Sequence, residues 1–135
     1  MALVRHQVID QQTAFASATR TVDFTPHSAA NYVKFYWNIS ATGGTTPGPS
    51  DLSLSYIDPT SGVVVALDEG AFAQIANTGH ALLVVHPALA SDVAGIPRNA
   101  RSLLPGQMRA SFTFSRTDGD ETYTYTLTAD WYTGT

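Results

Sequence analysis

Residues 121–131 read Glu-Thr-Tyr-Thr-Tyr-Thr-Leu-Thr-Ala-Asp-Trp. Threonine occupies every even position from 122 to 128, and the odd positions from Tyr123 to Trp131 are apolar or aromatic. Successive side chains of a β-strand point to opposite faces, so this alternation predicts a strand with one wet face and one buried face. A buried face needs a second layer to cover it.

The same alternation recurs along most of the chain. Residues 31–40 give the clearest long strand, with Phe35 and Trp37 on the apolar face and Tyr36 on the other. Residues 79–86 are apolar on both faces, so we expect both to be covered. The segment 41–50 is rich in Gly and Pro and predicts an exposed loop. Residues 70–75 fit a short helix or a strand, and the other expected strands are 4–9, 14–24, 52–56, 63–67 and 108–115.

Two short segments carry turn signals between alternating strands. Asp58-Pro59-Thr60-Ser61-Gly62 predicts one hairpin, and Thr117-Asp118-Gly119-Asp120 predicts another. The connection 87–106 is long and contains several prolines, with room for one helical turn near 88–93.

These elements predict an all-β fold. About eight strands with short turns and no long helix indicate an antiparallel two-sheet β-sandwich, either immunoglobulin-like or a jelly roll. At 135 residues we expect a single domain over 1–135, with an N-terminal docking segment at about 1–13. The predicted core contains Phe35, Trp37, Leu54, Leu83, Phe112, Tyr125 and Leu127.

Composition narrows the function classes. Charged residues make up 13% of the chain, against about 25% in an ordinary soluble domain, which suggests that partners cover much of the surface. The net charge is -4 and the arginines are scattered, so we expect no nucleic-acid partner. No apolar stretch approaches the roughly 20 residues that span a bilayer, and the N-terminus lacks a signal-peptide pattern. We therefore expect no membrane partner and no secretion by the usual signal.

Catalytic chemistry is not indicated. Cysteine is absent, and no serine lies in the strand-Gly-x-Ser-x-Gly-helix context of a nucleophile elbow. Asp68 and Glu69 could be paired carboxylates of a glycoside hydrolase, but adjacent strand residues point to opposite faces. We expect no enzyme activity, no catalytic residue and no cofactor.

Metal binding is not favoured either. His80 and His86 would lie about 20 Å apart on one strand, too far for one ion. Asp118, Asp120 and Glu121 could supply oxygen ligands for calcium, yet they lack the ligand spacing of a dedicated loop. We interpret these acids as a solvated hairpin tip and expect no metal site.

Tyr32, Tyr36 and Tyr132 fall on the faces opposite the core. An aromatic platform there could stack against sugar rings or pack against another protein. Half-burial of each tyrosine under a neighbouring loop explains the pattern equally well. We expect no small-molecule ligand.

An ordered set of segments from residue 31 to the C-terminus resembles small virion proteins of tailed bacteriophages, of the head decoration (cement) or minor capsid type. Its members are Asn31-Tyr32, the Gly/Thr/Pro loop 43–47, Leu-x-Leu-x at 52–55, Asp-Pro-Thr-Ser-Gly at 58–62, Thr-Gly-x-x-x-Leu-x-Val-x-Pro at 78–87, Leu104-Pro105 with Arg109, and the Tyr-rich 122–125.

The resemblance implies a non-enzymatic virion structural protein that binds and bridges major capsid subunits and so stabilises the shell. Its implied partners are the major capsid protein and copies of itself, with a trimer around a local threefold axis. Its implied place is the outer capsid surface of the virion, after assembly in the bacterial host cytoplasm. The alternatives are a tail, collar or fibre-associated virion β-sandwich and a carbohydrate-binding module.

Contacts with such partners are expected on 1–13 and 87–106. The first segment is an apolar strand edge that proteins normally pair or cover. The second presents apolar side chains between prolines, with arginines for partner carboxylates. The residues concerned are Leu3, Val4, Arg5, Val8, Ile9, Val93, Ile96, Arg98, Arg101, Leu103 and Leu104.

Overall fold

The computed structural model describes residues 2–86, 99–100 and 106–134. Within these ranges the chain forms strands and no helix, and therefore no helix there that is long and apolar enough to cross a membrane. The strands are β1 (Ala2–Phe15), β2 (Thr19–Phe24), β3 (Tyr32–Gly43), β4 (Pro47–Ile57), β5 (Val64–Ala71), β6 (Gly79–Val85), β7 (Asn99–Ala100), β8 (Met108–Arg116) and β9 (Thr122–Thr133).

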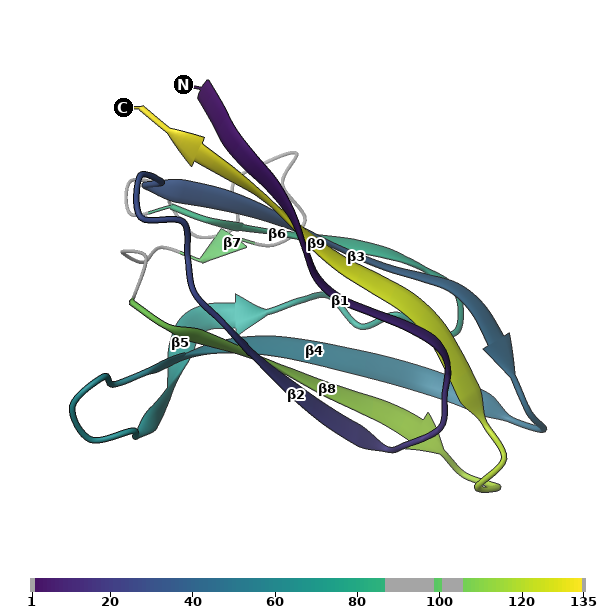
Figure 1. Cartoon of the computed structure of the whole chain (residues 1–135). Helices are drawn as coiled ribbons and strands as arrows, with labels where there is room; N and C mark the ends of the chain where they lie inside the picture. The colour runs from purple at the N-terminus through teal and green to yellow at the C-terminus, as the bar shows by residue number, and fades with distance from the viewer. Residues whose placement is uncertain (1, 87–98, 101–105, 135) are drawn as a thin grey trace.

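The strands form two packed sheets (Figure 1). The first sheet has the order β1-β9-β3-β6-β7, and the second has the order β2-β8-β4-β5. Every pairing is antiparallel except that of the two-residue β7 with β6. Apart from β7, the order and the alternation of strands between the layers are those of a jelly roll. The predicted all-β sandwich is confirmed, and of its two forms the jelly roll is the observed one.

The core lies between the two sheets and comes from the apolar faces that alternation predicted. On β3, Phe35 and Trp37 are fully buried, and their neighbours on the same face are at most 1% exposed. Trp37 packs edge-on against Phe72 and Phe112, with ring centroids 6.1 Å apart in both pairs. All seven predicted core residues are at most 1% exposed, so that prediction is confirmed.

The predicted loop 41–50 is wrong for most of its length. β3 continues to Gly43 in register with Thr122, and β4 begins at Pro47 opposite Arg116 of β8. Only 44–46 connects the two strands. The prolines are tolerated because the β4–β8 register is irregular between Pro47 and Ser50, and the Gly48 N–H donates to the Tyr123 hydroxyl at 3.0 Å.

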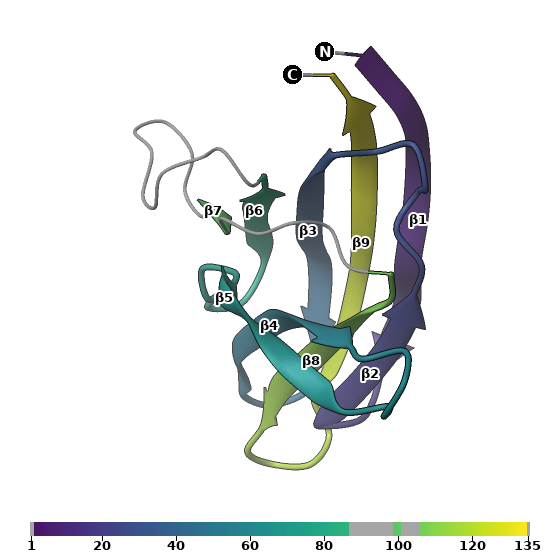
Figure 2. The same cartoon turned by 90° about the vertical axis from the view of Figure 1, so that its left-hand side faces the viewer.

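The predicted hairpin at 117–120 is also wrong. β8 belongs to the second sheet and β9 to the first, so this turn crosses between the layers (Figure 2). The corner is held by Arg116, whose guanidinium donates to the carbonyl oxygens of Glu121 and Gly119 at 3.0 and 2.7 Å. The hairpin predicted at Asp58 to Gly62 is confirmed, because β4 and β5 pair on either side of it.

The N-terminal segment is one long strand of the first sheet. The expected strands 4–9 and 14–24 are replaced by β1 and β2, with a break after Phe15. β1 pairs with β9 from Ala2↔Thr133 to Phe15↔Tyr123, which brings the two ends of the chain side by side (Figure 1). It is an edge strand with three register shifts, and such irregularities hinder pairing with another chain.

β1 also contributes a buried carboxylate. Asp10 is 6% exposed and accepts hydrogen bonds from Arg20 at 2.9 and 3.0 Å and from the Tyr125 hydroxyl at 2.6 Å. Burial by itself raises the pKa of Asp10, but the hydrogen bonds from Arg20, Tyr125 and Gln12 outweigh it and the pKa is lowered. Residues of the proposed docking segment are thus part of the sandwich, and a docking role for this segment stays a prediction.

The remaining expectations concern residues 70–93. Residues 70–75 form no helix: Gly70 and Ala71 end β5, and Ile75 bridges to Ser50. The predicted strand 79–86 is confirmed as β6, with Leu83, Val84 and Val85 buried. The helical turn predicted near 88–93 lies outside the described residues.

Candidate binding surface

The outer face of the first sheet carries polar and aromatic side chains that do not belong to the core. Lys34, Tyr36 and Asn38 alternate with the buried residues of β3 and therefore point away from the second sheet. Their cross-strand neighbours on β6 are Val84, Leu82 and His80, in that order. Tyr36 is 39% exposed, and it is the only aromatic residue among the exposed large hydrophobic side chains of the described part.

A surface hollow of about 640 Å³ lies beside Tyr36. Its volume falls within the roughly 300–1,000 Å³ of small-ligand sites. The hollow lies toward the Gly79 end of β6, whereas β7 pairs with β6 only at Val84 and Val85. It is lined by Tyr36, Trp37, Asn38, Ala73, His80, Ala81 and Leu82.

Two polar side chains stand at this hollow. Asn38 and His80 are exposed and face each other in the β3–β6 register. Within the described ranges, no hydrogen bond or ion pair engages either side chain. Asn38 can both donate and accept, and the His80 ring offers a donor or an acceptor on each nitrogen. The site thus combines an apolar, aromatic surface with polar groups that are free to bind a ligand.

The other two predicted outer-face tyrosines form a packed cluster. Tyr32 and Tyr132 stack with ring centroids 4.7 Å apart, and His86 packs edge-on against Tyr32 at 5.2 Å. Lys34 Nζ lies 5.3 Å from the centre of the Tyr132 ring, a cation–π distance. Of the two alternatives left open for these tyrosines, an exposed ring fits Tyr36, whereas burial fits Tyr32, which is only 5% exposed.

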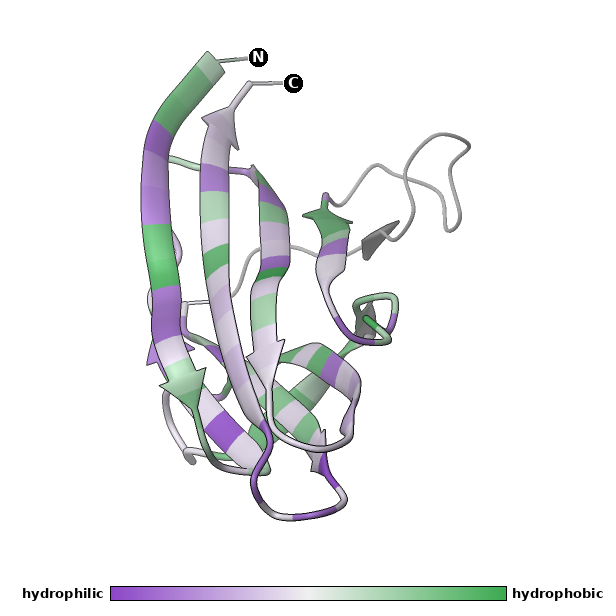
Figure 3. Cartoon of the chain, turned by 90° about the vertical axis from the view of Figure 1, so that its right-hand side faces the viewer, coloured by the Kyte–Doolittle hydropathy of each residue, from purple (hydrophilic) through white to green (hydrophobic). Residues whose placement is uncertain are grey.

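The residues predicted to bind a partner are accessible in part. Leu3, Val4 and Val8 are 55%, 36% and 53% exposed, and Arg5 is exposed as well. Figure 3 shows two apolar bands on this N-terminal part of β1, separated by a hydrophilic one. Ile9 is half-buried and packs against the core. Val93, Ile96, Arg98, Arg101, Leu103 and Leu104 lie outside the described residues.

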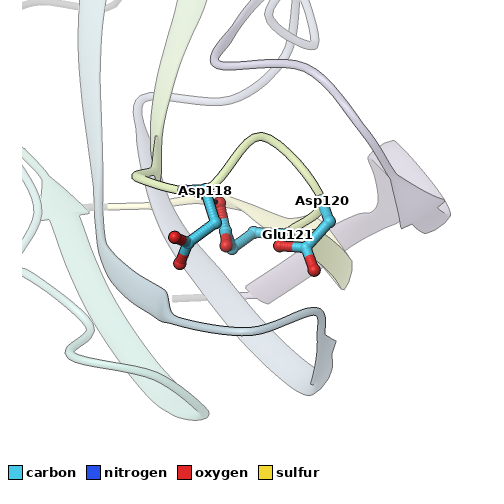
Figure 4. A group of neighbouring side chains, drawn as sticks. All are labelled: Asp118, Asp120 and Glu121. Atoms are coloured by element: carbon cyan, nitrogen blue, oxygen red, sulfur yellow. Dashed lines mark hydrogen bonds between the residues drawn. The ribbon is translucent and has the colours of Figure 1, made fainter.

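The acidic corner between β8 and β9 brings three carboxylates together (Figure 4). The ligand oxygens of Asp118, Asp120 and Glu121 lie within 4.8 Å of one another. The expectation of a solvated tip is wrong for Glu121, which is fully buried. Its carboxylate accepts backbone N–H groups from Asp118 and Gly119 at 3.0 and 3.1 Å and from Thr46 at 3.2 Å.

Asp120 of this corner is also engaged. It accepts the Thr45 hydroxyl at 2.6 Å and the Thr45 N–H at 3.1 Å, and these bonds lower its pKa to about 2. Asp120 and Glu121 therefore tie the connection between β3 and β4 to the turn between β8 and β9. Asp68 and Glu69 fall within β5, with their side chains outside the described part.

Sequence reasoning found Tyr36 but missed the hollow. Asn38 lies on the same face as Tyr36, and that parity was visible in the sequence. The contribution of His80 and Leu82 depends on the register between β3 and β6, which the alternation of residues does not specify. Ala73 comes from the irregular segment after β5, and no sequence pattern marked it as part of a site.

Comparison with known proteins places the chain in no family, because no family model matches it and no curated protein is similar to it at a significant level. Among solved structures, it resembles the CBM36-1 domain of a multidomain xylanase from the hindgut metagenome of Trinervitermes trinervoides. The TM-score is 0.45 and the identity 10%, over 97% of this chain and 100% of that one.

A second similar structure is CBM28, a carbohydrate-binding module specific for non-crystalline cellulose. Its TM-score is 0.37 and its identity 13%, over 96% of this chain and 75% of that one. At such scores the likeness carries no argument about function, which must come from the residues themselves.

Proposed function

We propose that this protein is a non-enzymatic carbohydrate-binding β-sandwich. The observation that carries the proposal is the hollow beside the exposed ring of Tyr36, with the free side chains of Asn38 and His80 across from each other. A sugar ring has an apolar face of C–H groups and a rim of hydroxyls. Tyr36 offers a surface for the first, and Asn38 and His80 offer hydrogen bonds to the second.

The test is a glycan-binding screen with the purified protein, followed by calorimetry on the glycans that bind. Tyr36→Ala is expected to weaken binding by at least about tenfold, because a tyrosine at the centre of a contact commonly dominates its energy. Asn38→Ala and His80→Ala each remove a hydrogen bond and are expected to weaken binding by about three- to tenfold.

Val63→Ala is the matched control. Val63 is 56% exposed and adjoins β5 of the second sheet, so its truncation removes exposed apolar surface away from the hollow. It is expected to leave affinity unchanged. Binding that survives Tyr36→Ala at full strength, or no binding to any glycan in the screen, contradicts the proposal.

A second function rests on a different edge of the molecule. We also propose that the protein is a virion surface protein of the decoration type, held to major capsid subunits and to its own copies through β1. The support is the resemblance of the sequence together with the exposure of Leu3 and Val8 on an edge strand. The threefold arrangement and the capsid location rest on the resemblance alone.

The two proposals are compatible, because β1 and β6 lie on opposite sides of β9 and β3 (Figure 2). The test uses the double variant Leu3→Ser and Val8→Ser, which changes two exposed side chains and leaves the buried Asp10 of β1 in place. Occupancy on particles that lack the protein is expected to fall at least about tenfold, since two exposed apolar contacts are lost. Unchanged occupancy contradicts docking through β1, and Tyr36→Ala is the control expected to occupy particles normally.

A further inference from the structure

The acids and the cations of the described part are unevenly distributed between the sheets. The strands β3 and β6 contain no acidic residue, and the first sheet holds only Asp10 and Asp130. Asp10 is buried and bound to Arg20, and Asp130 bonds His6 across the β1–β9 pair. The remaining acids with described side chains lie on the second sheet, on its hairpin or at the β8–β9 corner, and are Asp23, Asp51, Asp58, Asp118, Asp120 and Glu121.

Lys34 is the only lysine of the chain and lies on β3, where its acidic cross-strand neighbour is Asp130 of β9. It lies two residues from Tyr36 on the same face of β3, about 7 Å along the strand. Among the described residues no carboxylate lies within 4.0 Å of its ammonium group, whereas Arg20 and Arg109 each have an aspartate partner. The half-buried Lys34 side chain is supported instead by the Tyr132 ring.

A half-buried ammonium group without a counter-ion is suited to bind an anion. Lys34 does not line the hollow, but it lies two residues from Tyr36, which does. The Tyr132 ring beside the ammonium group replaces part of the water that would otherwise solvate it. A ligand that fills the hollow and extends along β3 toward Tyr32 passes Lys34. Asp130, the cross-strand neighbour of Lys34, already bonds His6.

We infer that the ligand of this site is a carboxylated glycan, whose acid group binds Lys34 while a neighbouring sugar ring packs on Tyr36. The inference rests on the proposed carbohydrate-binding function and names its substrate class. A uronic acid and a sialic acid both provide such a carboxylate.

The experiment compares ligands that differ only in the charge. Binding of polygalacturonate is measured against its methyl ester, and binding of sialyllactose against the methyl ester of its sialic acid, by calorimetry with the full chain. The acid forms are expected to bind about tenfold more tightly than their neutral partners, because a charge-assisted hydrogen bond is lost in the latter. The pair that shows the difference identifies the source of the carboxylate.

Variants of Lys34 test whether this residue causes the preference for the acid form. Lys34→Gln is expected to remove the preference for the acid form and to leave the affinity for the neutral form unchanged, whereas Lys34→Arg retains most of the preference. Raising the salt concentration is expected to reduce the preference of the wild-type protein and not that of Lys34→Gln. The folded state of each variant is checked by its unfolding transition.

The outcomes separate the two claims. Equal binding of acid and neutral glycans, with Tyr36→Ala still disruptive, overturns the inference about Lys34 and leaves carbohydrate binding in place. A preference for the acid form that persists in Lys34→Gln overturns it as well. Absence of glycan binding, or binding unaffected by Tyr36→Ala, overturns the proposed function and this inference together.

Discussion

The two faces of β3 differ sharply in burial. On the inner face, Phe35 and Trp37 are fully buried and in contact with aromatic rings of both sheets. On the outer face, Tyr36 is 39% exposed and Asn38 has no partner in the described part of the chain. One strand therefore supplies both the core and the candidate binding surface, and Trp37 contributes to both.

The largest expected effect compares adjacent residues on the two faces. Trp37→Ala leaves a cavity in the core and is expected to lower the free energy of unfolding by about 3–5 kcal/mol. Tyr36→Ala removes a partly exposed ring and is expected to cost less than about 1 kcal/mol. Urea unfolding measures both. Equal losses in the two variants would show that the outer face is as tightly packed as the inner one.

The inner side of the first sheet includes a polar network among Asp10, Arg20 and Tyr125. Arg20→Ala removes two hydrogen bonds to a buried carboxylate and is expected to cost about 1.5–3 kcal/mol at pH 7. Because folding lowers the pKa of Asp10, its contribution is present above the unfolded value of about 3.9 and is lost as the pH falls through the folded value.

The stability gap between wild type and Arg20→Ala is therefore expected to narrow below about pH 4. Urea unfolding of both proteins between pH 7 and pH 2.5 measures this difference in stability. A gap that stays constant across this range would mean that the network contributes through packing and not through the Asp10 charge. Arg109→Ala is the control: its partner Asp23 is exposed, so the loss should stay under about 1 kcal/mol.

Sequence patterns identified β3 and its core residues because the period of two is a local property of the strand. They failed where long-range pairing decides the outcome. The Asp118-Gly119 turn signal is the same whether the next strand joins the same sheet or crosses to the other one. Likewise, no sequence pattern indicated that Asp10 is buried, since its partners Arg20 and Tyr125 come from β2 and β9.

The candidate site, like the fold, was only partly predictable from the sequence. The outward parity of Tyr36 was evident from residues 31–40, whereas the hollow depends on β6 lying beside β3 with His80 opposite Asn38. The burial of Tyr32 depends on stacking with Tyr132 from the far end of the chain. Both are consequences of register, which one strand alone does not specify.

A smaller loss of stability is expected from a substitution of Glu121, in the turn between β8 and β9. In Glu121→Gln, an amide NH₂ replaces one of the two oxygens that accept backbone N–H groups from Asp118, Gly119 and Thr46. At least one donor is then left without a partner, at a cost of about 1–3 kcal/mol. Thermal unfolding measures the loss. A variant as stable as the wild type would show that these N–H groups find other acceptors.

The smallest expected effect is that of calcium. Three carboxylates within 4.8 Å of one another invite the expectation of a cation site, yet calcium takes 6–8 oxygen ligands. Both oxygens of Glu121 and both of Asp120 already accept hydrogen bonds from the protein, so an ion would have to displace these contacts. We expect neither calcium nor EDTA to change the melting temperature. A rise of several degrees with calcium, reversed by EDTA and lost in Asp118→Asn, would show that Asp118 recruits an ion and that the corner is a second functional site, separate from the outer face of β3.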